Sequence, residues 1–110
     1  MALHIDLDTE LARLNADPGW TKGHIARTLV KQDALRIVLI AIKADARIDE
    51  HKTEGPISIQ PLRGRMRVAA AGESFTLGAG QLLTLEASVP HDVLALEDSA
   101  FLLTIGWRRA

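Results

Sequence analysis

The feature that most constrains this chain is the spacing of its turn signals from residue 24 onward. Glycine, proline or acidic pairs recur there about every ten residues, and the segments between them are rich in β-branched and other apolar side chains. Strands are expected at residues 25–31, 35–43, 57–62, 66–70, 74–77, 82–86, 93–96 and 101–107. Short spacers at residues 63–64 and 72–73 predict tight hairpins and antiparallel pairing. Many short antiparallel strands form a sandwich or barrel, so the expected fold class is all-β.

The N-terminal segment follows a different period. Leu7, Leu11 and Leu14 recur at helical spacing, Asp6 is a good N-cap residue, and stop signals follow at residues 15–19. One short helix over residues 6–16 is therefore expected, followed by a linker at residues 19–23. Because the chain has 110 residues, it is expected to be a single domain. In that division residues 1–24 hold the helix and linker, and residues 25–107 hold the barrel.

Residues 35–42 form the most apolar run of the chain. Their β-branched content and the turn clusters on either side favour a strand over a buried helix. Both faces of this strand would be apolar, so one is expected in the core and the other against a second sheet or a partner subunit. The run therefore predicts a homodimer.

The overall composition excludes several classes of site and partner. The chain has 13 Lys plus Arg against 14 Asp plus Glu, 4% aromatic residues and no cysteine. The absence of cysteine rules out thiolate nucleophiles and cysteine-bearing metal sites. Arg63, Arg65 and Arg67 alternate and are expected to project from one solvated face, and nucleic acid is not expected as a partner. No apolar run approaches the roughly 20 residues of a membrane span, so no membrane partner and a cytoplasmic location are expected.

Residues 45–64 resemble the first signature motif of the cupin superfamily, which carries a glycine, His-x-His, a glutamate and a closing glycine. His51 and Gly64 are in register with the first histidine and the closing glycine. Asp45, Thr53 and Ile57 stand in place of the opening glycine, the second histidine and the glutamate. The first motif is therefore present in a reduced form.

The segment from residue 80 to residue 95 resembles the second cupin motif. Gly80 and His91 match its glycine and its histidine, whereas Glu86, Ser88 and Ala95 replace its proline, its second glycine and its asparagine. With the first motif, the resemblance covers residues 35–107. It implies a double-stranded β-helix, or jelly-roll barrel, preceded here by the short N-terminal α-helix, with the ligand site in the barrel interior.

The resemblance also implies a possible metal site. In metal-dependent cupins the motif histidines and glutamate hold one divalent cation, which assigns His51 and His91 here as ligands. Glu54 would complete a set of two histidines and one carboxylate if a bulge shifted its register. Imidazole and carboxylate suit Fe, Mn, Ni, Cu or Zn. Weak binding is expected, because the hydroxyl of Thr53 is not ionised at neutral pH and replaces a histidine poorly.

Alternation along the strands predicts the lining of the ligand pocket. Every second residue of a strand points to the same face. Residues that lie an even number of positions from a histidine are therefore expected on the same side as that histidine. The expected pocket is His51, Thr53, Ile57, Ile59, His91, Val93 and Ala95. This pocket is largely apolar around two imidazoles. His4 and His24 are expected at the surface.

Three functional interpretations stay open from the sequence. The favoured one is a cupin-like protein that binds a small molecule in an interior pocket around His51 and His91, where a histidine acts as a hydrogen-bonding group or general base. The first alternative is a metal-dependent cupin enzyme, an oxygenase or isomerase of a small metabolite. The second is a non-catalytic dimeric interaction module, in which both histidines are satisfied within a filled barrel.

Overall fold

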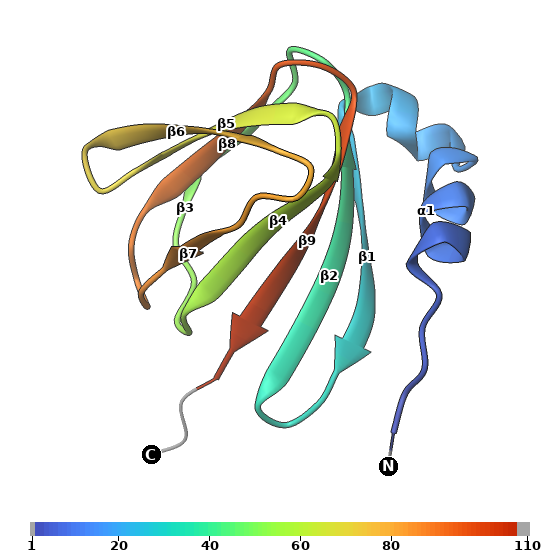
Figure 1. Cartoon of the computed structure of the whole chain (residues 1–110), viewed down its shortest axis with the longest axis horizontal. Coiled ribbons are helices and arrows are strands. Elements are labelled where there is room, and N and C mark those ends of the chain that lie inside the picture. The colour runs from blue at the N-terminus through green and yellow to red at the C-terminus, as the bar shows by residue number, and fades with distance from the viewer. Residues whose placement is uncertain (1, 108–110) are drawn as a thin grey trace.

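The chain forms two antiparallel β-sheets that face each other, with one helix outside them (Figure 1). This computed structural model describes residues 2–107, apart from the side chains of residues 21 and 22. Within those residues the five-stranded sheet has the order β1 (His24–Lys31), β2 (Leu35–Ile42), β9 (Ser99–Gly106), β4 (Ile57–Arg63) and β7 (Leu83–Leu85). The four-stranded sheet has the order β3 (Arg47–His51), β8 (His91–Ala95), β5 (Arg65–Ala70) and β6 (Glu73–Gly78). The expected all-β jelly-roll barrel is confirmed.

The N-terminal helix begins where its cap was expected. Helix α1 (Leu7–Asn15) starts after Asp6, whose carboxylate accepts the backbone N–H groups of Asp8 and Thr9. The expected linker is instead a short 3₁₀ helix (Pro18–Lys22), which begins after Asp17, whose carboxylate accepts the N–H of Gly19. Within residues 2–107 no helix has both the length and the apolar character needed to cross a membrane.

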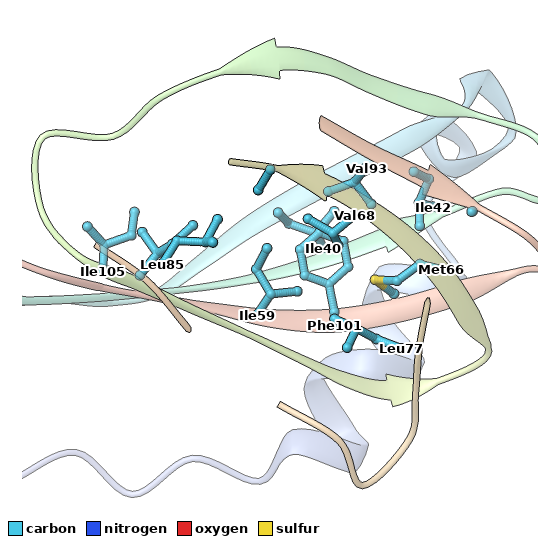
Figure 2. Packing of buried hydrophobic residues seen from close by; sticks show 13 residues of the cluster. Ile40, Ile42, Ile59, Met66, Val68, Leu77, Leu85, Val93, Phe101 and Ile105 are labelled. Atoms are coloured by element: carbon cyan, nitrogen blue, oxygen red, sulfur yellow. The ribbon is translucent and has the colours of Figure 1, made fainter. Parts of the chain in front are cut away.

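The two faces of β2 enter two different apolar clusters. Ile40 and Ile42 point between the sheets, where Figure 2 shows Ile40 beside the ring of Phe101. Leu39 and Ala41 point outward and pack with leucines of α1. The outer face of this strand is therefore covered in part by the chain's own helix, where a second sheet or a partner subunit was expected. The homodimer stays a prediction.

One strand was missed by the sequence analysis. Strand β3 (Arg47–His51) has the sequence Arg-Ile-Asp-Glu-His and is mostly exposed, so it lacks the apolar alternation that marks the other strands. Its pairing with β8 explains its presence, since Arg47 lies opposite Leu94 and Ile48 lies opposite Val93. Pairing with β8 therefore stabilises β3, although its local sequence favours a strand only weakly.

The turn at Gly64 differs from the hairpin that the sequence predicts. The hairpin expected at residues 72–73 is present, since Ala70 pairs with Glu73 across the turn between β5 and β6. Residues 63–64 were also expected to close a hairpin, but β4 and β5 belong to different sheets. Gly64 instead makes the corner at which the chain crosses from one sheet to the other. A short spacer predicts a sharp turn and does not tell whether the flanking strands pair.

Gly64 occupies this corner for two physical reasons. Its φ is +81°, a region that residues with a side chain rarely adopt. A Cβ atom added at Gly64 would also lie 2.5 Å from the carbonyl oxygen of Asp98 and would collide with the side-chain oxygen of Ser99. Gly72 has a similar φ of +76° but open space around the same position.

These two glycines provide a matched test of the corner. We expect Gly72→Ala to lower the free energy of unfolding by about 1–2 kcal/mol, the cost of a left-handed conformation. Gly64→Ala should lower it distinctly further, because the backbone of residues 98–99 must also move. Urea unfolding of both variants measures the difference. Equal losses for the two variants would contradict this account of the corner.

Candidate functional site

Two histidines lie side by side where β3 ends and β8 begins. His51 and His91 are partners in the antiparallel pairing of these strands, and their ring centroids are 4.3 Å apart with planes tilted by 58°. His91 is 2% exposed, whereas His51 is exposed. The pair therefore connects the barrel interior with its open end.

A β-bulge turns His51 inward. Ile48 pairs with Val93, and the next matched pair is His51 with His91, so three steps along β3 match two steps along β8. Since Val93 and His91 are two residues apart on one strand, they share a face, and the bulge places Ile48 and His51 on that same face. Without the bulge, residues 48 and 51 would point to opposite sides.

Each imidazole ring is held by a carbonyl of its own segment. Nδ1 of His91 is 3.0 Å from the carbonyl oxygen of Val89, and Nδ1 of His51 is 2.9 Å from that of Asp49. A carbonyl oxygen only accepts, so both Nδ1 atoms carry hydrogen and donate. Among the described residues, Nε2 of neither ring has a hydrogen-bond partner. Both rings are thus oriented through one nitrogen, and the other nitrogen is available.

The histidine pair borders a small, partly enclosed cavity between the sheets. The cavity has a volume of about 40 Å³. Its lining residues are Ile40, Ile48, His51, Ile59, His91, Val93, Phe101 and Leu103. A water molecule takes up about 30 Å³ of liquid, whereas sites for drug-sized ligands measure roughly 300–1,000 Å³. The cavity thus has room for an ion or one end of a ligand, and a larger ligand would extend into the open end of the barrel.

The predicted pocket overlaps this cavity only in part. Of the predicted residues, four line this cavity: His51, Ile59, His91 and Val93. The other lining residues come from β2, β3 and β9. The apolar run at residues 35–42 marks Ile40 as buried but, because both faces of that strand are apolar, it does not tell which residues face the cavity. Which strands face one another across the barrel depends on the topology, which alternation does not reveal.

Three predicted lining residues lie elsewhere. Ile57 is buried beside Leu85 and Ile105, at the end of the five-stranded sheet. Ala95 is fully buried opposite Met66, further from the histidines along β8. The hydroxyl of Thr53 donates a 3.0 Å hydrogen bond to the carbonyl of Gly55, in the loop after β3. Alternation does not continue through that loop, so it could not place residues 53 and 57 relative to His51.

Glu54 does not join the histidines. It is exposed in the bend that follows β3. No group of three histidine, aspartate or glutamate side chains arranged to hold a metal ion is found among the described residues. The bulge precedes His51 and brings this histidine inward, whereas Glu54 lies beyond the end of β3, where the strand register no longer applies.

The three arginines of residues 63–67 do not share one face, contrary to expectation. Arg63 ends β4 in the five-stranded sheet, whereas Arg65 and Arg67 lie on β5 in the four-stranded sheet. The corner at Gly64 separates them. All three are exposed, as a solvated surface requires.

The fold is supported by similarity to solved structures. No protein-family model and no curated protein sequence match the chain. An RmlC-like cupin protein from Desulfovibrio desulfuricans is similar with a TM-score of 0.77 and 24% identity, over 96% of both chains. A conserved protein of unknown function from Streptococcus pyogenes is similar with a TM-score of 0.73 and 25% identity, over 79% of this chain and 76% of that one.

A further solved structure is that of an enzyme. The DMSP lyase DddQ from Ruegeria pomeroyi is similar with a TM-score of 0.73 and 14% identity, over 83% of this chain and 50% of the lyase. Likeness at this level of identity concerns the fold, and one fold carries many activities. Together with the two-sheet topology, these neighbours establish that the chain has the cupin fold.

Proposed function

We propose that this chain binds a small molecule at the open end of its barrel, with one polar group of the ligand against His51 and His91. The observation that carries the proposal is the pairing of these two imidazoles at the cavity, with His91 at 2% exposure among apolar side chains. Each ring has one nitrogen, Nε2, without a hydrogen-bond partner among the described residues, and a few polar groups in an apolar enclosure are typical of small-molecule sites. The cupin-fold lyase supports the proposal by analogy only.

The chemistry of the pair follows from its tautomers. Since both Nδ1 atoms donate to backbone carbonyls, each neutral ring has a lone pair on Nε2. Each lone pair accepts one hydrogen bond, so an ammonium group or two neighbouring hydroxyls of a ligand would pair with both. The lone pairs also accept a proton, so the same pair is suited to act as a general base. The proposed ligand therefore has a hydrogen-bond donor at the end that enters the barrel.

A weakly bound divalent cation is the second candidate, and the same tautomers favour it. Metal-binding histidines commonly donate their other ring N–H to a backbone carbonyl, as both histidines do here. Two imidazole nitrogens fit such an ion, but the described residues offer no third protein ligand beside them. The available donor set predicts low affinity, with His51 and His91 as its ligands.

Binding at the histidines is tested with their ring signals. Small organic acids, sugars and sugar acids would be added singly while the NMR signals of the His51 and His91 rings are followed. We expect at least one compound to shift both signals until binding saturates. A ligand group in contact with Nε2 changes the magnetic shielding of both rings. His91→Phe, which removes the nitrogen and keeps a ring, should abolish the response, whereas the surface variant His24→Ala should keep it.

The opposite result would support another interpretation. If no compound shifts these signals, the proposed function is wrong, and the chain is better described as an interaction module with a filled barrel.

Metal binding is tested on protein without a histidine tag, offered Fe, Mn, Ni, Cu and Zn in turn. Elemental analysis and calorimetric titration should show weak uptake that His51→Ala or His91→Ala lowers by at least about tenfold, since each removes a ligand. Glu54→Gln should leave uptake unchanged, because the Glu54 side chain is exposed and away from the pair. Tight, stoichiometric binding that Glu54→Gln abolishes would show instead that Glu54 completes the ligand set.

A further inference from the structure

Arg36 stands on the inner side of the barrel at the same end as the histidine pair. Residues 35–42 pair with β9 without interruption, so Arg36 shares its face with Ile40 and Ile42, which point between the sheets. Figure 1 shows that the start of β2 lies at the end of the barrel where β3 ends and β8 begins. Arg36 is therefore an inward-facing cation at the mouth of the proposed site.

Arg36 differs from the other arginines of the described chain. It is the only one among them that is not exposed. Arg27 and Arg47, although exposed, lie 3.4 Å and 3.6 Å from carboxylate oxygens, whereas Arg36 forms no ion pair within the described residues. Its Nε is buried and has no hydrogen-bond partner there. A partly buried guanidinium without an anion is costly to the fold, which makes this position unusual.

The guanidinium lies over an aromatic ring and has no hydrogen-bond acceptor among the described residues. Cζ of Arg36 is 5.3 Å from the centroid of the Trp107 ring, and Trp107 itself packs against the core. A cation–π contact provides no hydrogen-bond acceptor, so the N–H groups keep their capacity to donate. The planar fork of guanidinium N–H groups matches the two oxygens of a carboxylate.

The distance between Arg36 and the cavity sets the size of the ligand. Ile40 lines the cavity, and Arg36 lies four residues further toward the open end, which is about 13 Å along a strand. The guanidinium lies over the Trp107 ring and does not line the cavity. A ligand of several carbon atoms would bridge the two, whereas a metal ion or a single water molecule would not.

We propose that the ligand is a small carboxylate, held by Arg36 through its acid group and by His51 and His91 through two hydroxyls at its other end, one for each Nε2 acceptor. Sugar acids and longer polyhydroxy acids have this chemistry. The inference rests on the proposed function, since it names the class of ligand for the same site. In this proposal, Arg36 makes the site bind acids more tightly than their neutral analogues.

The test compares glucuronate and other hydroxy acids with their uncharged counterparts, such as glucose, in Arg36→Gln and in the unmodified chain. We expect Arg36→Gln to weaken binding of the acid by about tenfold or more and to leave the neutral analogue unchanged. Arg67→Gln removes the same charge from an exposed position on β5 and should leave both affinities unchanged. Thermal unfolding of each variant verifies folding, and the ratio of acid to neutral affinity does not depend on stability.

A second readout uses tryptophan fluorescence. In Trp20→Phe, Trp107 is the remaining tryptophan of the sequence, so its emission should change when the acid binds and not when the neutral analogue binds. Acids that bind equally well to Arg36→Gln, with shifts of the His51 and His91 signals, would overturn the inference and leave the proposed function standing. Acids that need Arg36 but do not shift those signals would contradict the proposed function. Failure of every acid to bind would overturn the inference.

Discussion

The pairing of β3 with β8 determines where the candidate site lies. β3 is short, polar and mostly exposed, and it sits at the edge of the four-stranded sheet. Its bulge leaves Ile48 opposite Val93 and brings His51 opposite His91, so that an apolar side chain and an imidazole from one strand both reach the interior. If the bulge were absent, His91 would be a single buried histidine and the cavity would lose half of its polar lining. The paired rings, their orientation and the proposed ligand contact all depend on this one irregularity.

The barrel interior combines extensive apolar packing with very few polar atoms. Side chains from both sheets fill most of the space, and the remaining cavity of about 40 Å³ adjoins the two imidazoles. A few convergent polar groups in an apolar enclosure are typical of small-molecule sites. Here they are the two imidazoles that line the cavity and the guanidinium of Arg36, four residues from Ile40 along β2. Their separation favours an elongated ligand with different groups at its two ends.

The sequence predicted the elements with strong local signals. The capping carboxylate of Asp6, the apolar strands and the inward alternation of His91 and Val93 are all present in the structure. The features it did not predict depend on contacts between distant segments. β3 lacks an apolar pattern and forms by pairing with β8, and the corner at Gly64 has the same short spacing as a hairpin. Arg36 resembles any charged residue at the start of a strand until the fold shows that it faces inward.

The central claim is that two imidazoles, fixed through Nδ1, present their Nε2 lone pairs to the barrel interior. Long-range ¹H–¹⁵N NMR spectra, recorded at alkaline pH so that imidazole rings are neutral, report which ring nitrogen carries the hydrogen. We expect His51 and His91 to show a protonated Nδ1 and an unprotonated Nε2, because each Nδ1 donates to a carbonyl. The exposed His4 and His24 provide the comparison within the same sample. A hydrogen on Nε2 of either His51 or His91 would contradict the proposed site.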